Sequence, residues 1–414
     1  MVNFFKYAAE NGGSVKLLDT QETGSRGMFN PSIINKDGKL YMSFRSAEYT
    51  FLNYLEKQPP LNDLLSWYPL LIYSIYSKAP VNFVSYNYIC EIDKQSFTVK
   101  NVKPVFTNLE TRKNIYNGAE DIRLFFDKDN NIRAAYSLYE DSGKISMNFD
   151  TLDSDFNVTS HVSYSPEQYE KNWMPVIDMP DTFIRKPFED IVTEKDRSRA
   201  IIHTSKNADL NKRGSTQLIK INNGYICIVH RRMQYGDKKQ YEHQFVMTDN
   251  DFHVTKTSQW FVFAGLPIEF TCGMCILEQD LIIPVSVFDS ATFIIKININ
   301  EVLDFIDEKE TVVKRSFGDT GNILLMELLS DNKSEKIPMV IDEYVIRNIP
   351  HNKAAMIACR THLATLLSQT KKKSLELYVQ ALCDIKKFDI GMEYKYTHML
   401  IGQDLIRDCI EKLI

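Results

Sequence analysis

"EDIRLFFDKDNNIRAAYSLY", residues 120–139, places a charged head before an apolar run, a polar turn and a second apolar run. Apolar runs of this length separated by Asp and Asn predict two antiparallel β-strands joined in a hairpin. Because side chains alternate faces along a strand, Asp121 and Arg123 should lie on one side and Glu120 on the other. An ion pair or a turn-capping acid would explain the three charges, unless other segments bring polar groups to the same place.

Three further segments repeat this plan of polar head, apolar strand, turn and second apolar strand. They are "NPSIINKDGKLYMSFR" (30–45), "STQLIKINNGYICIVHRR" (215–232) and "EFTCGMCILEQDLIIPVSVFD" (269–289). Hairpins that recur at intervals of tens of residues are typical of propeller blades, because one blade cannot bury both faces of its sheet alone. The innermost strands of a propeller begin at one mouth, so Asn30, Asp121 and Glu269 are expected to meet there.

The chain changes character after about residue 305. Residues 1–305 are short apolar runs broken by Asn, Asp and Gly, whereas residues 306–414 carry apolar side chains at helical spacing. We therefore expect an all-β propeller followed by a C-terminal α-helical region. A hydrophobic insertion at about 51–80 contains the longest apolar stretch, residues 64–76, which is too short for a bilayer span and includes Pro69. We expect it to pack on the body, with contact to a membrane or a partner as the alternative.

The bulk composition narrows the class of protein. With 44% hydrophobic and 25% charged residues, the 414-residue chain is typical of a soluble globular protein. A formal net charge of -5 and a pI near 6.0 give no basic field, so nucleic acid is not expected as a partner. The N-terminus lacks the pattern of a secretory signal, which predicts a cytoplasmic protein. A homo-oligomer remains open.

Metal ions and other cofactors are not expected. The seven cysteines are scattered, which suits reduced thiols. Cys272 and Cys275 form a C-x-x-C, but no second pair accompanies it, and a strand would send the two sulfurs to opposite faces. The "DSD" at 153–155 is interpreted as part of a turn.

Set in order, these segments resemble glycoside hydrolase family 130, the five-bladed propeller family of β-mannoside phosphorylases, and the related β-1,2-mannosyltransferases. "NPSII", with Arg45 fifteen positions after Asn30, resembles the Asn and Arg that hold the donor sugar in that family. "GAEDIRLFF" (118–126) resembles its G-x-E-D-P-R motif, whose Asp is the catalytic acid, here Asp121. Ile122 stands where the family has proline. The resemblance spans about residues 25–300 and implies a five-bladed β-propeller catalytic domain.

Later motifs extend the resemblance. They are "EKNWMPV" (170–176) with its Lys-Asn pair, "RGSTQLIKINNGYICIVH" (213–230) ending in a phosphate-binding His, and "VFDSAT" (287–292) with a site Asp. The lysine that phosphorylases carry nineteen residues before that His falls on Asn211, with Lys212 and Arg213 adjacent. Trp173 could be core or a stacking platform for a sugar.

These motifs imply chemistry at a glycosidic bond. An inverting enzyme manages with one carboxyl group if its nucleophile is already ionised, as phosphate is, whereas a hydrolase needs two carboxylates. The predicted site has Asp121 as catalytic residue, a substrate-binding set (Asn30, Arg45, Glu120, Lys171, Asn172, Trp173, His243, Glu269 and Asp289) and a phosphate-binding set (Arg123, Lys212, Arg213, His230 and Arg231).

The leading prediction is a glycosyltransferase or glycoside phosphorylase that transfers a glycosyl unit, mannosyl by the resemblance, with inversion. Its donor would be a sugar phosphate or a nucleotide sugar, and its acceptor a carbohydrate. Two alternatives stay open. A hydrolase of the same fold would use Glu269 or Asp289 as base, and a non-catalytic propeller would bind glycans or proteins. Convergence of Asp121, Asn30, Arg45, Asp289 and His230 is expected of an enzyme.

Overall fold

The protein is described here by a computed structural model. It describes residues 2–18, 28–47, 49–50, 73–74, 83–109, 116–140, 144–164, 171–187, 190–193, 199–201, 212–235, 238–263, 268–287 and 291–308. The predicted helical region beyond residue 308 and most of the insertion at 51–80 lie outside these residues.

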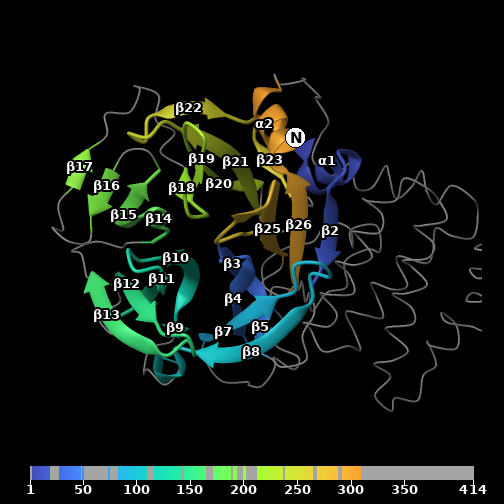
Figure 1. The fold of residues 1–414 in the computed structure, drawn as a ribbon. Helices are drawn as coiled ribbons and strands as arrows, with labels where there is room; N and C mark the ends of the chain where they lie inside the picture. The colour runs from blue at the N-terminus through green and yellow to red at the C-terminus, as the bar shows by residue number, and fades with distance from the viewer. Residues whose placement is uncertain are drawn as a thin grey trace, which may run out of the picture.

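The described chain is built almost entirely of β-sheets arranged around a common centre (Figure 1). Two successive sheets lie on one side of the ring. The first contains β3 (Phe29–Lys36), β4 (Lys39–Ala47), β7 (Phe83–Ile92) and β8 (Val99–Val105), with β9 (Tyr116–Asn117) on β7. The second contains β10 (Glu120–Phe126), β11 (Ile132–Tyr139), β12 (Ile145–Leu152) and β13 (Val158–Tyr164). A 3-10 helix at Thr107–Leu109 precedes β9.

Three more sheets complete the ring. One contains β14 (Met174–Val176), β15 (Met179–Lys186), β16 (Asp190–Thr193) and β17 (Arg199–Ile201). The next contains β18 (Arg213–Gly214), β19 (Ile219–Ile221), β20 (Gly224–Tyr235), β21 (Lys238–Thr248), β22 (Val254–Thr257) and β23 (Phe261–Val262), with β1 (Val2–Asn3). The last contains β24 (Cys275–Leu277), β25 (Asp280–Val287), β26 (Ala291–Asn298) and β2 (Ser14–Leu17). A separate pair joins β5 (Tyr49–Thr50) to β6 (Tyr73–Ser74).

Each sheet begins near the centre and ends at the rim. Figure 1 shows β3, β10, β14 and β18 facing the middle of the ring, with β8, β13, β17 and β22 outside. The hairpins predicted at 30–45, 120–139, 215–232 and 269–289 are confirmed as β3–β4, β10–β11, β19–β20 and β24–β25. The sequence prediction of an all-β, propeller-like arrangement is therefore confirmed for the described residues.

The first two strands of the chain, β1 and β2, join the last two sheets of the ring. β2 pairs antiparallel with β26, so that Ser14 lies opposite Lys296, and β1 runs parallel to β23. Between them, helix α1 (Phe4–Glu10) buries Phe4 and Phe5. The Phe4 ring packs against Phe305 of helix α2 (Ile299–Asp307) at a centroid separation of 5.2 Å. The last sheet is thus completed by the beginning of the chain.

Helix α2 belongs to the β domain. Its buried residues Val302, Phe305 and Ile306 join a hydrophobic cluster, the largest among the described residues, which also takes in strands of the β20 and β25 sheets. The domain boundary expected after residue 305 therefore falls inside a helix that packs on the propeller. Among the described residues, no helix is both long and apolar enough to cross a bilayer.

A recurring turn joins the third and outer strands of three sheets. It begins at Asp93, Asp153 and Asp249 and reaches a Phe with a left-handed backbone, namely Phe97, Phe156 and Phe252. The Asp153 carboxylate accepts hydrogen bonds from the backbone N–H groups of Asp155 and Asn157, and Asp249 does the same for its own turn. Such Asx turns satisfy the chain reversal locally. The "DSD" segment is thus a turn.

Candidate active site

Two inner strands begin with an irregular step in their pairing. The register shifts between Phe29 and Ser32 on β3, and between Glu120 and Arg123 on β10. At these steps Asn30 and Asp121 adopt left-handed backbones, with φ of 47° and 56°. A bulge of this kind turns a side chain away from the strand's regular alternation. Both side chains are thereby brought together although ninety residues separate them in sequence.

Gly118 lets the head of β10 approach the neighbouring sheet. Its φ is +89°, and a Cβ atom built there would lie 2.1 Å from the carbonyl oxygen of Ser85. Only glycine fits both the left-handed backbone and this close contact. The glycine of the "GAED" motif therefore sets the position of the two acids that follow it.

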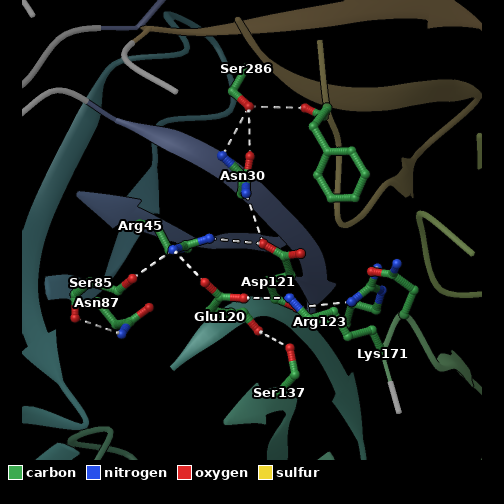
Figure 2. Close-up of polar contacts among 12 residues, drawn as sticks. Asn30, Arg45, Ser85, Asn87, Glu120, Asp121, Arg123, Ser137, Lys171 and Ser286 are labelled. Atoms are coloured by element: carbon green, nitrogen blue, oxygen red, sulfur yellow. Dashed lines mark hydrogen bonds and ion pairs between the residues drawn. The ribbon is translucent and has the colours of Figure 1, made fainter. Parts of the chain in front are cut away.

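Asp121 lies at the centre of a polar cluster (Figure 2). Its Oδ1 atom accepts hydrogen bonds from Asn30 Nδ2 at 2.8 Å and from Arg45 Nη1 at 3.1 Å. No described residue donates to Oδ2, and 16% of the Asp121 side-chain surface is exposed to solvent. The carboxylate thus has one anchored oxygen and one that can meet a ligand.

The charges around Asp121 favour its ionised form. Burial alone would raise the pKa of the carboxyl group, but the neighbouring cations, Arg45 first, and the amide of Asn30 outweigh it. The pKa of Asp121 consequently lies below its usual value. In the absence of ligand Asp121 is therefore a carboxylate near neutral pH.

Arg45 is held from several sides. Its Nε and Nη2 atoms donate to the Ser85 hydroxyl at 3.1 and 2.6 Å, and Nη2 also meets Glu120 Oε1 at 3.2 Å. The guanidinium carbon lies 5.1 Å from the centre of the Phe29 ring. A planar fork fixed in this way presents its charge to Asp121 in one orientation.

Glu120 links two cations from different parts of the chain. While Oε1 meets Arg45, Oε2 accepts from Lys171 Nζ at 2.9 Å. Lys171 also donates to the hydroxyl of Tyr139 at 3.0 Å, and its ammonium lies 4.6 Å from the centre of that ring. Both Glu120 oxygens are therefore occupied, in contrast to the open oxygen of Asp121.

Arg123 was predicted to bind phosphate, but its side chain is buried. Only 1% of it is exposed. Its nitrogens donate to the backbone oxygens of Ser215, Asp121 and Gly214 at 2.7, 2.9 and 3.2 Å, and to Asn172 Oδ1 at 3.1 Å. These contacts use four of the five N–H groups of a guanidinium. Arg123 therefore joins the β10, β14 and β20 sheets, and this geometry does not suit a phosphate ligand.

Asn172 and Trp173 are neighbours in sequence, but their side chains lie in different surroundings. Asn172 has a left-handed backbone, with φ of 63°, and its side chain joins the cluster through Arg123. Trp173 is 1% exposed and packs among Phe149, Tyr164 and Phe183 at centroid separations of 5.1–6.2 Å. Trp173 is thus a core residue, and the alternative of a sugar platform is wrong because neighbouring rings cover it.

His230 reaches the cluster indirectly. Its Nδ1 is 2.8 Å from the hydroxyl of Ser215, whose carbonyl oxygen binds Arg123. Burial, with the charges of nearby residues, holds the pKa of His230 well below its usual value. A neutral imidazole can donate or accept a hydrogen bond, but it cannot neutralise a phosphate.

Two other predicted residues lie in buried surroundings. His243 sits opposite His230 on β21 and packs against Phe261 and Phe263. Burial lowers the pKa of His243 to about 3. Neither ring nitrogen of His243 forms a hydrogen bond with a described residue. Glu269 Oε2 accepts a hydrogen bond from the Phe263 N–H at 2.7 Å, just after β23.

Two of the three remaining predicted cations lie beside Trp260. Lys212 Nζ lies 5.6 Å and the Arg231 guanidinium 4.1 Å from its ring centre. Arg231 Nε also pairs with the buried Glu242 at 2.6 Å. Arg213 is exposed beside His230 on the paired strand. The sequence predicted these three cations for the site, but the contacts of the Asp121 carboxylate come from Asn30 and Arg45, and Lys171 contacts the adjacent Glu120. Asp289 lies outside the described residues.

Sequence reasoning missed three members of the site. Ser85 holds Arg45, Tyr139 holds Lys171, and Ser286 hydrogen bonds both the backbone N–H and the side chain of Asn30. Each is a common polar residue at the end of an apolar strand, so no local pattern separates it from its neighbours.

One further group of possible metal ligands exists among the described residues. Asp249, Asp251 and His253 place their ligand atoms within 4.8 Å of one another. They form the recurring turn described above, and their mutual hydrogen bonds account for the arrangement.

Comparisons with known proteins give likenesses of fold. No family model and no curated protein matches the sequence. A β-1,2-mannobiose phosphorylase from Listeria innocua aligns with 71% of this chain and 99% of its own at 15% identity, with a TM-score of 0.48. The mannose phosphorylase MPT-4 from Leishmania mexicana aligns with 70% of this chain and 89% of its own at 13% identity and a TM-score of 0.45. A structure described with the statement that the GH130 family of mannoside phosphorylases contains glycoside hydrolases that target β-1,2-mannosidic linkages in Candida mannan aligns with 66% of this chain and 85% of its own, at 11% identity and a TM-score of 0.42.

Proposed function

We propose that the protein is a carbohydrate-active enzyme that transfers a glycosyl unit with inversion, with Asp121 as its single acid/base. The observation that carries this proposal is the asymmetry of the carboxylate. One oxygen is anchored by Asn30 and Arg45, and the other meets no described residue. The motif resemblance supports the same role for Asp121 and favours mannosyl as the transferred unit.

One open carboxylate suits a single displacement. Hydrolysis with inversion would need a second carboxylate to activate water. Among the described acids of the site, Glu120 spends both oxygens on Arg45 and Lys171, and Glu269 accepts from a backbone N–H. A donor with an ionised leaving group removes that need, because the reaction then requires only one proton transfer.

The low pKa of Asp121 favours the synthetic direction. A carboxylate that is ionised at rest can accept the proton of an acceptor hydroxyl as that oxygen attacks the anomeric carbon. The bond from the anomeric carbon to the phosphate oxygen of the donor then breaks, and the phosphate leaves with the electron pair. A sugar 1-phosphate or a nucleotide sugar would serve as donor.

We also infer that the five larger sheets are five blades. Each is a meander that starts at the centre, and the β25 sheet is completed by β2 from the beginning of the chain. This closure unites the two ends of a ring, which is how a propeller protects its last edge.

A donor panel tests the proposed function. Purified protein is incubated with sugar 1-phosphates and nucleotide sugars plus simple mannoside acceptors, and products are followed by mass. Asp121→Asn should abolish transfer, whereas Asp155→Asn, an exposed turn acid, should leave it unchanged. Equal turnover by both variants, or no turnover by the unmodified protein with any donor, would reject the proposal.

A further inference from the structure

Lys171 is the cation of the site with a free donor. It lies just before β14, and its ammonium reaches Glu120 of β10 and Tyr139 at the end of β11. An ammonium has three N–H groups, and these two contacts leave one that no described residue accepts. Because 31% of the Lys171 side-chain surface is exposed to solvent, the remaining N–H group can donate to a ligand.

Tyr139 restricts where that donor points. A lysine side chain has several rotatable bonds and gains little from one surface contact. Here the ammonium both lies over the Tyr139 ring, at 4.6 Å, and donates to its hydroxyl at 3.0 Å. The Glu120 carboxylate holds it from the other side at 2.9 Å. Two partners from neighbouring strands thus fix the ammonium near Asp121.

The ammonium group of Lys171 stays protonated near neutral pH. Burial alone would lower the pKa of the ammonium, but Glu120 first and then Asp121 outweigh it, so the pKa lies above its usual value. The influence of Lys171 also appears in the lowered pKa of Asp121. Arg45 contacts both Asp121 and Glu120, and Lys171 contacts the other oxygen of Glu120, so the cation and the carboxylate belong to one cluster.

Most other described candidates for an anionic group have partners or surroundings of their own. Lys212 lies over the Trp260 ring, and Arg213 is exposed opposite His230. Arg123 donates to backbone oxygens and Asn172, His230 is neutral, and Arg231 is paired with Glu242 beneath Trp260. Lys171 is the cation with both exposure and proximity to Asp121.

We propose that Lys171 binds the phosphate group of the donor and that Tyr139 is the positioning residue that aims it. This inference rests on the proposed function and adds the residues that recognise the leaving group. As the carbon–oxygen bond to the phosphate breaks, the departing oxygen takes the electron pair and accepts a hydrogen bond from the Lys171 ammonium. The acceptor oxygen forms the new bond, and its proton passes to Asp121 Oδ2.

The test compares two leaving groups in two tyrosine variants. Tyr139→Phe keeps the ring but removes the hydroxyl that holds Lys171. The matched control is Tyr136→Phe, on the same strand, whose hydroxyl donates to Asp150 at 2.8 Å. Each variant is assayed with the sugar 1-phosphate and with the corresponding glycosyl fluoride, whose ground state carries no charge.

Tyr139→Phe should lower kcat/KM for the sugar 1-phosphate about tenfold, mainly through KM, because a hydrogen bond to a charged group is lost. With the fluoride, kcat/KM should stay within about twofold of the unmodified protein, as it should for Tyr136→Phe with either donor. Equal losses with both donors, or no loss with the phosphate donor, would overturn the role of Tyr139.

A binding measurement separates this inference from the proposed function. Inorganic phosphate is titrated into the unmodified protein, Tyr139→Phe and Lys171→Met by calorimetry. We expect weaker binding in Tyr139→Phe and loss of binding in Lys171→Met, whether or not a donor is turned over. Phosphate affinity that is unchanged in Lys171→Met, or absent from the unmodified protein, rejects the phosphate site even if Asp121 proves catalytic.

Discussion

At the scale of single residues, the site depends on which oxygen of the Asp121 carboxylate accepts hydrogen bonds. Asn30 and Arg45 fix the same oxygen of Asp121, and no described residue donates to the other oxygen. Glu120, its neighbour in sequence, lies between two cations instead. Adjacent acids with different surroundings take different roles, because surroundings set both the pKa and the access of each group.

Removing the charge of Arg45 should shift the pH dependence of transfer. Arg45 is the foremost cation that lowers the pKa of Asp121, so Arg45→Met should raise that pKa. Since Asp121 must be ionised to accept a proton, activity would then be lost at a higher pH on acidification. We expect the acid limb of kcat/KM to move up by about one pH unit.

Arg45→Lys provides the control for this shift because it keeps the charge while losing the fork that meets Ser85 and Glu120. Its acid limb should stay closer to that of the unmodified protein. An acid limb that does not move in Arg45→Met would show that Asp121 is not the group whose ionisation it reports.

At the scale of the strand, the left-handed bulges decide where the site lies. β3 and β10 each start with such a step, and Gly118 allows the second one to lie against Ser85. The positions of Asn30 and Asp121 therefore depend on backbone shape as much as on side-chain type.

Gly118→Ala should disturb this arrangement more than a comparable glycine elsewhere. Gly38 also has a left-handed backbone, with φ of +79°, but nothing lies within 4 Å of a Cβ built there, whereas at Gly118 a backbone oxygen lies at 2.1 Å. Gly38→Ala should lower the free energy of unfolding by about 1 kcal/mol, for the backbone strain alone. Gly118→Ala should cost about 3 kcal/mol and reduce transfer as well.

Urea denaturation of the two variants, with an activity assay on each, checks this difference. Equal losses of stability would mean that the close approach to Ser85 relaxes without cost. Full activity in Gly118→Ala would mean that the glycine does not set the position of the acids.

The same scale explains what the sequence could and could not predict. Alternation and turn residues predicted the four hairpins, since those signals are local. Trp173 was ambiguous because its partners Phe149 and Phe183 come from other strands. Arg123 was expected to meet phosphate because its charge is visible in the sequence. The backbone oxygens that satisfy it, from Ser215 and Gly214, are not. The turns at 153–156 and 249–252 also share a D-x-D-F pattern ("DSDF" and "DNDF"), a local signal that the sequence reasoning did not use.

At the scale of the whole molecule, stability depends on the join between the two ends of the domain. Phe4 is fully buried, and its ring packs against Phe245, Phe261, Phe263 and Phe305. These rings come from the β20 sheet, the segment after it and helix α2. A small N-terminal helix thus completes the largest hydrophobic cluster among the described residues.

Phe4→Ala should therefore be costly although it lies far from Asp121. We expect a loss of about 3–5 kcal/mol in the free energy of unfolding, since the cavity lies among rigid rings. Val158→Ala is the control, because Val158 is 44% exposed on the outer strand β13 and should change stability by less than about 0.5 kcal/mol. Calorimetric melting of both variants decides the matter. A small effect of Phe4→Ala would show that the core closes without α1.

The pairing of Ser14 with Lys296 also has a consequence during synthesis. A ribosome releases β2 long before it makes β26, so the β2 segment must wait, without its partner strand, until nearly the whole domain has emerged. Contacts between residues so distant in sequence form late because their loop-closure entropy must be overcome first. The last step in folding of the nascent chain should thus be the pairing of β2 with β26. Until these strands pair, the edge of β26 stays open to chaperones or to other chains.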